Sequence, residues 1–351
     1  MSLKYRVIQA AFEGLALSGL TGPVRRLSRC RGVIFTLHRV LPEPPSPFSP
    51  NAILQITPDF LAFAIERMRQ LGFDIVDLDE ALQRVVAPEA GRPFAVFTFD
   101  DAYRDNLVHA LPVLRRLDCP FTVYVPSGLV DGLGEIWWQA LEDIIAAQAG
   151  ISIPGGEGET VFDLRSLSRK REAYAAIYSR MRRMPEPERV AFIRALAARY
   201  GCDLQRQCRE LIMNWDELTA MAMDPLCSIG AHTVHHYELA KLPEADARRE
   251  IEDSVSALAS RLGRVPRHLS YPIGDARAAG PREFALAAEL GLASAVTTRP
   301  GGLYAAGRQR LTALPRISLN GLFQARRYVD VFATGAVFSA LRANAASSAP
   351  E

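Results

Sequence analysis

The chain has 351 residues, of which 49% are hydrophobic and 23% charged, and its formal net charge is +2. This length is sufficient for one large domain or two smaller ones, and the composition is that of an ordinary soluble globular protein. The small net charge gives no reason to expect a nucleic-acid-binding surface, and no run of about eighteen apolar residues predicts a transmembrane helix.

Cysteine usage and the N-terminal residues bear on the cellular compartment. The five cysteines are odd in number and form no C-x-x-C pair, which is unlike a disulfide framework and fits a reducing compartment. Residues 7–20 are only mildly apolar and contain Glu13, so they make a poor signal-peptide core. We expect residues 1–30 to form an amphipathic helical segment of a cytoplasmic protein, with peripheral contact to the inner membrane as an option.

Arginines gather at two places, Arg25-Arg26 and residues 180–183. We interpret both groups as solvated faces of the protein. A weak attraction to an anionic lipid or a polyanionic glycan is the alternative.

The first part of the chain alternates strands and helices. A Thr-Pro-Asp sequence at residues 57–59 is typical of a helix start, with Thr57 as N-cap and Pro58 at the first helical position. Strands and helices that alternate at this spacing predict a parallel sheet. The expected strands are 33–38, 73–78, 94–99 and 121–125, and the expected helices are 57–70, a short one from 79, and 104–117.

The alternation of strands and helices stops between residues 131 and 224, where charged helical segments and a glycine-rich turn predict a helical insertion. After it the alternation resumes, with strand candidates that bring the total to seven or eight and favour a barrel over an open sheet. The later elements are strands at 227–232, 268–273, 294–298 and 315–319 and a helix at 243–262. We expect residues 31–335 to form one catalytic domain that contains the insertion, followed by a C-terminal tail at 336–351.

Two adjacent carboxylates, Asp100 and Asp101, end the unbroken apolar run that begins at Phe94. Such a run is typical of a strand buried on both faces. Carboxylates at its end are costly unless a metal, hydrogen bonds or water compensates them, and the carboxyl ends of parallel strands are where active sites form. The alternative is that the two residues simply cap a following helix.

Three of the six histidines lie within five residues, at His232, His235 and His236. His232 and His236 are spaced i, i+4, so a helical turn would place them on one face, where they can bind one ion. Any single histidine here could instead cap a helix or lie on the surface. Three of them directly after a strand favour a functional site.

Taken together, the two features offer one carboxylate and two imidazoles from two strand ends. Catalytic zinc typically has three protein ligands and an open position for water. The second carboxylate is then free to act as a base toward a water whose pKa the metal lowers. The sequence therefore predicts metal-assisted hydrolysis.

These residues resemble the NodB-homology polysaccharide deacetylases, carbohydrate esterase family four. Residues Thr98-Phe99-Asp100-Asp101 match the first motif of that family, and the His232–His236 stretch matches its second, His-(Ser/Thr)-x-x-His. The resemblance covers about 30–335 apart from the insertion. It implies a distorted (β/α) barrel of about seven parallel strands, and removal of an acyl group, usually N-acetyl, from a sugar of a glycan, an oligosaccharide or a lipid-linked precursor.

The resemblance also implies residue roles. Asp100 would be the general base, and Asp101, His232 and His236 would bind a divalent metal, with Zn²⁺ the expected ion. The third family motif corresponds to Leu269–Gly274, where Ser270 replaces the usual arginine.

The turn of this motif is retained although the arginine is replaced by Ser270, and this leads to two further expectations. The N–H of Ile273 can still donate to an oxyanion. We expect Arg316 to replace the missing cation, although it could be an ordinary surface arginine; Arg267 is a weaker candidate.

Other candidates rest on position alone. The family's general acid is a histidine in a late Leu-His motif, and here the Leu37-His38 pair ends the first expected strand, as in a circularly permuted member. Trp137 and Trp138 either stack on sugar rings or anchor the insertion, and Tyr271 is a further substrate-binding candidate.

Three functions from different classes fit the sequence. The leading one is a metal-dependent carbohydrate deacetylase. The second is a hydrolase of cyclic amides or imides on the same fold. The third is a catalytically silent glycan-binding protein, which the missing motif-three arginine favours and the complete set of aspartates and histidines opposes.

Overall fold

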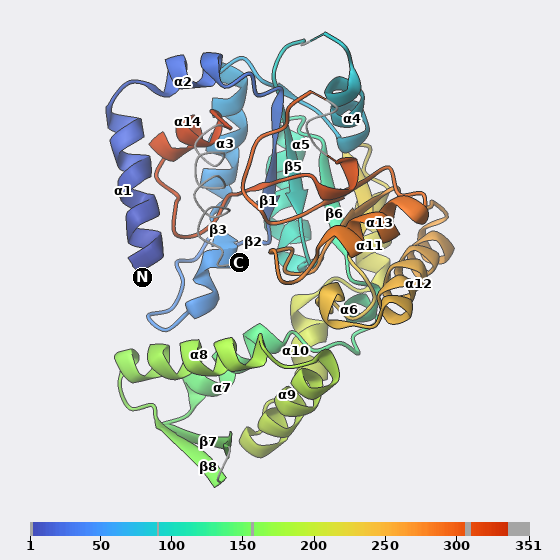
Figure 1. Cartoon of the computed structure of the whole chain (residues 1–351). Coiled ribbons are helices and arrows are strands. Elements are labelled where there is room, and N and C mark those ends of the chain that lie inside the picture. The colour runs from blue at the N-terminus through green and yellow to red at the C-terminus, as the bar shows by residue number, and fades with distance from the viewer. Residues whose placement is uncertain (1–2, 90, 156–157, 306–309, 336–351) are drawn as a thin grey trace, which may run out of the picture.

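The computed structural model describes residues 3–89, 91–155, 158–305 and 310–335, and an eight-stranded sheet forms its centre (Figure 1). The strand order is β11-β10-β9-β6-β5-β1-β12, with β4 paired to β5, and every pair in this sheet is parallel. The strands are β1 (Gly32–Leu37), β4 (Asp74–Ile75), β5 (Phe94–Phe99), β6 (Phe121–Val125), β9 (Cys227–Ala231), β10 (His268–Ser270), β11 (Ser294–Val296) and β12 (Ile317–Ser318).

The two end strands of this path meet through a parallel bridge between Val296 and Leu314, the latter just before β12. The sheet therefore curls into a distorted barrel, which confirms the predicted fold class. Every residue of β1 and β5 is buried, as their unbroken apolar runs predicted. Their register pairs Leu37 with Phe99, so the residues that follow the two strands lie side by side.

Helices cover the outside of the barrel. The side chain of Thr57 accepts a hydrogen bond from the N–H of Phe60 and caps α3, which confirms the predicted start of that helix. Gly263 ends α12 in the left-handed conformation, with φ of 68°. The covering helices are α3 (Pro58–Gln70), α4 (Leu78–Val86), α5 (Leu111–Arg116) with a preceding π-helical turn (Asn106–Ala110), α6 (Ser127–Val130), α11 (Trp215–Ala222), α12 (Glu244–Leu262) and α13 (Pro281–Glu289).

Short elements fill the connections. They are two small strands that pair with each other, β2 (Arg39–Val40) and β3 (Gln55–Ile56), and three 3₁₀ helices at Pro50–Leu54, Leu239–Lys241 and Leu311–Ala313.

The N-terminal residues form two helices, α1 (Leu3–Leu17) and α2 (Thr21–Leu27). Phe12 of α1 is buried against the rings of Phe323, Tyr328 and Phe332, in and beside the last helix, α14 (Arg327–Phe332). The first and last described segments of the chain are therefore packed together (Figure 1). Among the described residues, no helix is both long enough and apolar enough to cross a membrane. The expected tail at 336–351 lies outside the described residues.

The stretch at 131–224 contains five helices and one hairpin. The helices are α7 (Trp137–Ala147), α8 (Leu167–Met181), α9 (Glu186–Tyr200), α10 (Leu204–Leu211) and α11, and the hairpin pairs β7 (Gly150–Gly155) with β8 (Gly158–Asp163). In Figure 1 the elements α7 to α10 gather at one end of the barrel. The hairpin is an addition to the purely helical insertion that the sequence predicted. Its signal is the alternation of Ile151 and Ile153, both 2% exposed, with more exposed neighbours.

Candidate active site

Asp100 and Asp101 follow β5 at its carboxyl end. The N–H of Asp100 continues the sheet by donating to the carbonyl oxygen of Leu37 (2.9 Å). The chain then turns sharply, since Asp101 and Ala102 have φ of 74° and 56°. Met213 holds this turn by donating its N–H to the carbonyl oxygen of Ala102 (3.0 Å). The two aspartate side chains leave the strand in different directions and both are buried.

The stretch from His232 to His236 follows β9 as a loop, so the expected helical turn is wrong. Thr233 and His236 have φ of 63° and 56°, and the Thr233 hydroxyl accepts the N–H of His236 (3.1 Å). Glu250 on α12 accepts the N–H groups of Val234 and His235 (3.0 and 2.9 Å). The loop is therefore strained and held by hydrogen bonds, and the side chains of His232 and His236 lie on the same side of it.

Asp101, His232 and His236 converge. The Oδ1 atom of Asp101 lies 3.4 Å from Nε2 of His232 and 3.2 Å from Nε2 of His236. All three side chains are buried, and one ligand atom from each lies within 4.8 Å of the others. Zn–N and Zn–O bonds of about 2.0–2.2 Å in a tetrahedron separate ligand atoms by roughly 3.3–3.6 Å, close to these two distances.

The hydrogen bonds of the three side chains favour a cation between them. Nδ1 of His232 lies 2.6 Å from the carbonyl oxygen of Ser270, which can only accept, so Nδ1 carries the proton. In the neutral imidazole, Nε2 then presents a lone pair toward Asp101, whose Oδ1 has no hydrogen-bond donor. Two facing acceptors in a buried site repel unless a proton or a metal ion separates them. The residues therefore fit a divalent metal.

The pKa of His232 and that of Asp101 reflect the same contact. Burial lowers the pKa of His232, but the adjacent Asp101 and Asp100 carboxylates outweigh it and raise the pKa overall. Burial raises the pKa of Asp101, but the neighbouring imidazoles outweigh it and hold this pKa well below its usual range. The carboxylate is therefore anionic and available as a ligand.

Asp100 forms a bidentate ion pair with Arg316. Nη1 and Nη2 of Arg316 donate to the two carboxylate oxygens of Asp100 (2.8 and 2.6 Å). Burial raises the pKa of Asp100, but the guanidinium outweighs this effect and lowers the pKa overall. The structure thus places Arg316, the candidate cation from the sequence, directly against Asp100. Arg267 instead pairs with Asp79 (2.8 Å).

Arg316 is itself held rigidly. Its guanidinium donates to the carbonyl oxygen of Thr297 and to the hydroxyls of Thr98 and Ser270 (3.1, 3.0 and 2.9 Å). Ser270, which stands where the family has arginine, is small enough to leave room for this incoming side chain. Its hydroxyl and carbonyl contact Arg316 and His232, a bridging role that the sequence did not indicate.

A cavity of about 900 Å³ opens above these residues. His38, Asp100, Asp101, His232 and His236 all line it. Much of the remaining wall is apolar or aromatic, and it comes from the β2–β3 region and from α7 and α8. These wall residues include Pro47, Pro50, Ile53, Leu54, Trp137, Trp138, Tyr174, Ala175, Tyr178, Ile273 and Leu322.

The two tryptophans line the cavity and also support its other walls. The Trp138 ring lies 4.8 Å from the His236 ring, and its Nε1 donates to the Tyr103 hydroxyl (3.0 Å). The Trp137 ring packs against Tyr178 at 5.0 Å. Both tryptophans are almost fully buried, so each anchors the insertion while presenting an edge to the cavity.

Tyr271 is not brought to the cavity. Its side chain is 1% exposed, and its hydroxyl donates to the carbonyl oxygens of Thr312 and Glu283 (2.8 and 3.3 Å). The ring packs on Phe284 of α13. Tyr271 therefore stabilises the barrel wall, and we do not retain it as a substrate-binding candidate.

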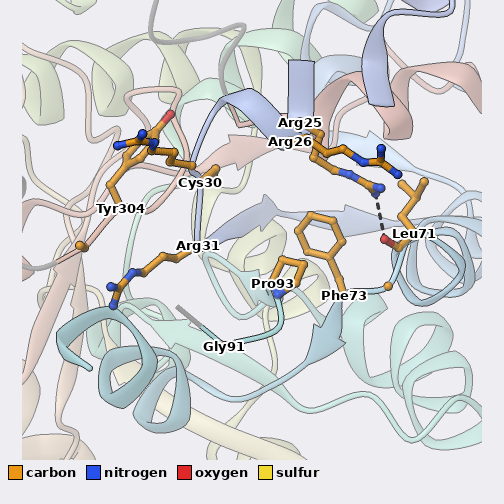
Figure 2. Close-up of a pocket in the computed structure, with 12 residues that line it drawn as sticks. Arg25, Arg26, Cys30, Arg31, Leu71, Phe73, Gly91, Pro93 and Tyr304 are labelled. Carbon is orange, nitrogen blue, oxygen red and sulfur yellow. Dashed lines mark hydrogen bonds between the residues drawn. The ribbon is translucent and has the colours of Figure 1, made fainter. Parts of the chain in front are cut away.

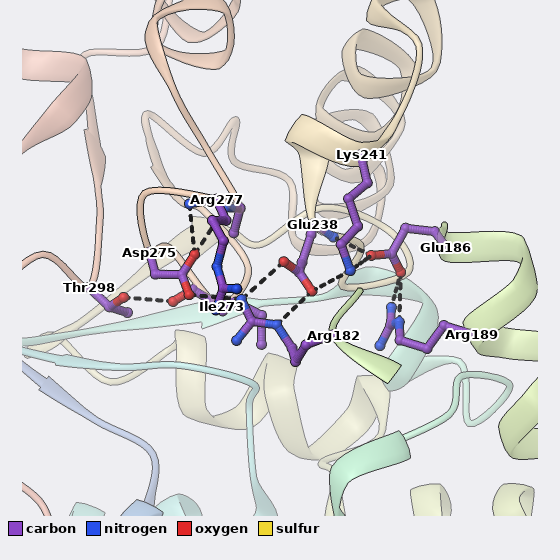
Figure 3. Close-up of polar contacts among 10 residues, drawn as sticks. Arg182, Glu186, Arg189, Glu238, Lys241, Ile273, Asp275, Arg277 and Thr298 are labelled. Atoms are coloured by element: carbon purple, nitrogen blue, oxygen red, sulfur yellow. Dashed lines mark hydrogen bonds and ion pairs between the residues drawn. The ribbon is translucent and has the colours of Figure 1, made fainter. Parts of the chain in front are cut away.

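Ile273 lies at the cavity in a turn with φ of 60°, and its carbonyl oxygen accepts the Thr298 hydroxyl (2.7 Å). Figure 3 shows a charged network that continues from this turn to the insertion. Arg182, at the end of α8, donates to Asp275 beside the turn (2.8 Å) and to Glu238 after the histidine loop (2.9 Å).

The network continues into α9, which contributes Glu186 and Arg189. Lys241 contacts Glu238 (2.8 Å) and lies 3.6 Å from Glu186, which also pairs with Arg189. Apart from the basic residues at 180–183, no local pattern in the sequence indicated this network.

Comparisons with known proteins agree with this geometry. A model of the polysaccharide deacetylase family matches residues 162–294, which include His232, His236 and Ile273. The match begins within the 131–224 stretch that the motif resemblance leaves out. No curated protein sequence gives a significant match.

Three solved structures share the fold. They are the deacetylase PplD of Streptococcus pyogenes in complex with acetate (TM-score 0.53, 18% identity, covering 82% of this chain and 92% of that one), IcaB from Ammonifex degensii (0.55, 18%, 87% and 97%) and a polysaccharide deacetylase from Bacillus cereus (0.51, 14%, 85% and 68%). The resemblance that the two motifs predicted is therefore confirmed in the matched segment and in the fold.

Proposed function

We propose that this chain, which has the polysaccharide deacetylase fold, is a metal-dependent hydrolase that removes an acyl group, N-acetyl first of all, from a sugar of a glycan or glycolipid. The observation that carries the proposal is the meeting of Asp101, His232 and His236 beside the Asp100–Arg316 pair. The segments that supply the aspartates and the histidines are about 130 residues apart in sequence and converge at the floor of one cavity.

Asp101, His232 and His236 would hold the metal. When bound, it would supply Lewis-acid polarisation of the acyl carbonyl and a water made acidic enough to attack near neutral pH. The donor set of one carboxylate and two imidazoles favours Zn²⁺ among the common ions. The carbonyl of Ser270 fixes the tautomer of His232 that such a ligand requires.

Asp100 would act as the general base. Its lowered pKa keeps it ionised near neutral pH, and the bidentate contact with Arg316 holds the carboxylate in one orientation. This pair also removes the main argument for a catalytically silent protein, because Arg316 supplies the cation that is missing at Ser270.

Ile273 and His38 would complete the reaction. The Ile273 N–H lies in a turn at the cavity and is our candidate donor to the oxyanion that forms on attack. His38 follows β1, which is paired with β5, so it faces the same cavity as Asp100. We propose that His38 protonates the leaving amine.

The wall of the cavity favours an amphipathic substrate. Prolines, aliphatic side chains and aromatic rings line the side next to the β2–β3 region and α8. The aromatic rings can stack on a sugar, and the prolines and aliphatic side chains beside them offer a surface on which a lipid-linked sugar can bury its apolar part. We therefore propose a glycolipid precursor in preference to a long free glycan.

Metal content and turnover, measured together, test the proposed function. For Asp100→Asn we expect zinc content to stay at the wild-type level while kcat on an N-acetylated sugar falls by about 10²–10⁴-fold, because the base is lost and the ligands remain. For His236→Ala we expect both zinc and activity to be lost.

The matched control is His235→Ala, since His235 lies in the same loop but contacts Glu250 (2.6 Å) and does not line the cavity. This variant should keep zinc and most of its activity. Normal turnover by Asp100→Asn would show that the base is misassigned, and full zinc content in His236→Ala would exclude the proposed metal site.

A further inference from the structure

A second cavity, of about 640 Å³, lies at the opposite end of the barrel from the catalytic cavity. Figure 2 shows the residues that line it. It is bordered by α2 and by the residues that precede β1, β4 and β5, such as Arg31, Phe73 and Pro93. The catalytic residues follow the carboxyl ends of β1 and β5. Six residues of strand at about 3.3 Å each separate the two sites by roughly 20 Å.

Four arginines line this cavity, and no carboxylate does among the described residues that form it. They are Arg25, Arg26, Arg29 and Arg31. No ion pair joins any of them to an acidic residue in the described part of the chain, whereas nearby Arg67 and Arg84 each contact an aspartate at 2.7 Å. The cavity therefore carries a concentrated positive charge without a protein counter-ion.

Two of these arginines, Arg25 and Arg31, are oriented by contacts with the protein, and the other two are available to a ligand. Arg25 donates to the carbonyl oxygen of Leu71 (2.9 Å) and lies over the Phe73 ring at 5.8 Å. Arg31 donates to carbonyl oxygens at the end of α4, which offset part of its charge. Arg26 and Arg29 have no side-chain partner among the described residues and are exposed.

We propose that this cavity binds a phosphate group. Guanidinium groups bind phosphate oxygens through paired hydrogen bonds, and several of them around one concave site give selectivity for a compact multivalent anion over chloride. The phosphate can belong to a lipid headgroup or to a soluble phosphate compound. Leu20 precedes the arginines and Leu27 lies between Arg26 and Arg29; both are exposed (53% and 82%), which gives this segment apolar side chains to insert beside a lipid headgroup.

Two probes separate these sources: inorganic pyrophosphate, followed by calorimetry, and phosphatidylcholine vesicles with and without phosphatidylglycerol, followed by co-sedimentation. The test variant is Arg26→Gln/Arg29→Gln, because neither side chain supports the fold. The matched control is Arg248→Gln/Arg249→Gln on α12, which removes the same charge from two arginines that already pair with Glu289 and Asp246.

We expect the wild-type chain and the control to bind, and the Arg26→Gln/Arg29→Gln chain to bind at least about tenfold more weakly. Binding to pyrophosphate alone identifies a soluble ligand; binding to phosphatidylglycerol vesicles that pyrophosphate displaces identifies a lipid headgroup. Hydrolytic activity on a soluble substrate should be equal in all three proteins. The proposal is overturned if the wild-type chain binds neither probe, or if the control weakens as much as the test variant.

Discussion

Arg316 is the residue on which the state of Asp100 depends. A buried carboxylate without a partner would be protonated or destabilising, and it could not serve as a base. Arg316 compensates it with two hydrogen bonds and is in turn fixed by three neighbouring oxygen atoms. The fold thus provides an ionised and oriented carboxylate at the floor of the cavity.

Arg316→Lys should therefore impair both stability and turnover. Lysine keeps the charge but offers a single ammonium in place of the planar fork, so Asp100 loses its bidentate contact. We expect a loss in unfolding free energy below the roughly 3–5 kcal/mol that removal of a buried partner costs, and a fall in kcat at unchanged zinc content.

Chemical denaturation, zinc analysis and kinetics at saturating substrate measure these effects. Arg267→Lys is the control, because the Arg267 side chain is exposed and forms its ion pair with Asp79, away from Asp100. Equal kcat for Arg316→Lys and the wild type would contradict the orienting role.

At this scale the sequence was informative wherever a residue type carries its own chemistry. Asp101, His232 and His236 could be grouped because each follows a strand and each offers a metal ligand. Arg316 could be named only as a candidate, since its contact with Asp100 spans 216 positions and no local pattern encodes it. Tyr271 was misplaced because Ile273 of the same motif lines the cavity while the Tyr271 ring points into the barrel wall.

Among the elements, the turn around Ile273 depends on the insertion. Arg182 joins the end of α8 to Asp275 beside that turn and to Glu238 after the histidine loop (Figure 3). The insertion therefore does more than cover the cavity, since it helps to position the proposed oxyanion donor.

Arg182→Met should loosen this turn. We expect kcat to fall more than KM rises, together with a loss of about 1–3 kcal/mol in unfolding free energy, because Glu238 is left with fewer partners in a buried site. Arg183→Met is the matched control, as the Arg183 side chain donates only to the Ser179 hydroxyl among the residues that the structure describes. If KM alone changed, or if both variants behaved alike, the positioning role would be wrong. Partial recovery in Arg182→Lys is expected.

The N-terminal helix is held to α14 by Glu13. Its carboxylate accepts from Arg327 and from the Tyr328 hydroxyl, and the Arg327 hydrogen bond is the main reason that its pKa falls from 4.5 to about 2. A lowered pKa contributes stability that is fully present above pH 4.5 and is lost as the pH falls through about 2.

We expect amide exchange in α1 to be slow at neutral pH in the wild type and faster in Glu13→Gln, with a smaller difference between the two proteins as the pH approaches 2. Hydrogen exchange followed by mass spectrometry measures this. Identical α1 protection in the two proteins at pH 7 would show that Phe12 and its apolar contacts hold the helix without Glu13.

The sequence predicted most elements of the barrel because their patterns are local. Unbroken apolar runs marked β1, β5 and β6, and the Thr-Pro-Asp sequence at residues 57–59 marked a helix start. The histidine loop was mispredicted as helical. A bent loop with positive φ at Thr233 and His236 can also bring two side chains that are four residues apart to the same side. The hairpin β7–β8 was missed because its flanking helices dominate the composition of the insertion.

On the scale of the whole molecule, the barrel separates two charged sites. The carboxyl ends of its strands carry the acidic and imidazole groups under the insertion, and the amino ends carry the arginine cavity beside α2. Because β1 and β5, which run between the two sites, are buried along their whole length and closely packed, a change at one end should leave the chemistry at the other unaltered. This separation would let a single chain bind the proposed anion at one end and process the proposed substrate at the other.

We propose that Asp101, His232 and His236 bind one divalent metal beside Asp100. Anomalous diffraction at the zinc edge, from crystals grown with zinc, can locate such an ion. We predict one strong peak at about 2.0–2.2 Å from Asp101 Oδ1 and from Nε2 of both histidines, with Asp100 outside bonding distance. A map with no peak among these three side chains, or with zinc bound only elsewhere, would contradict the account.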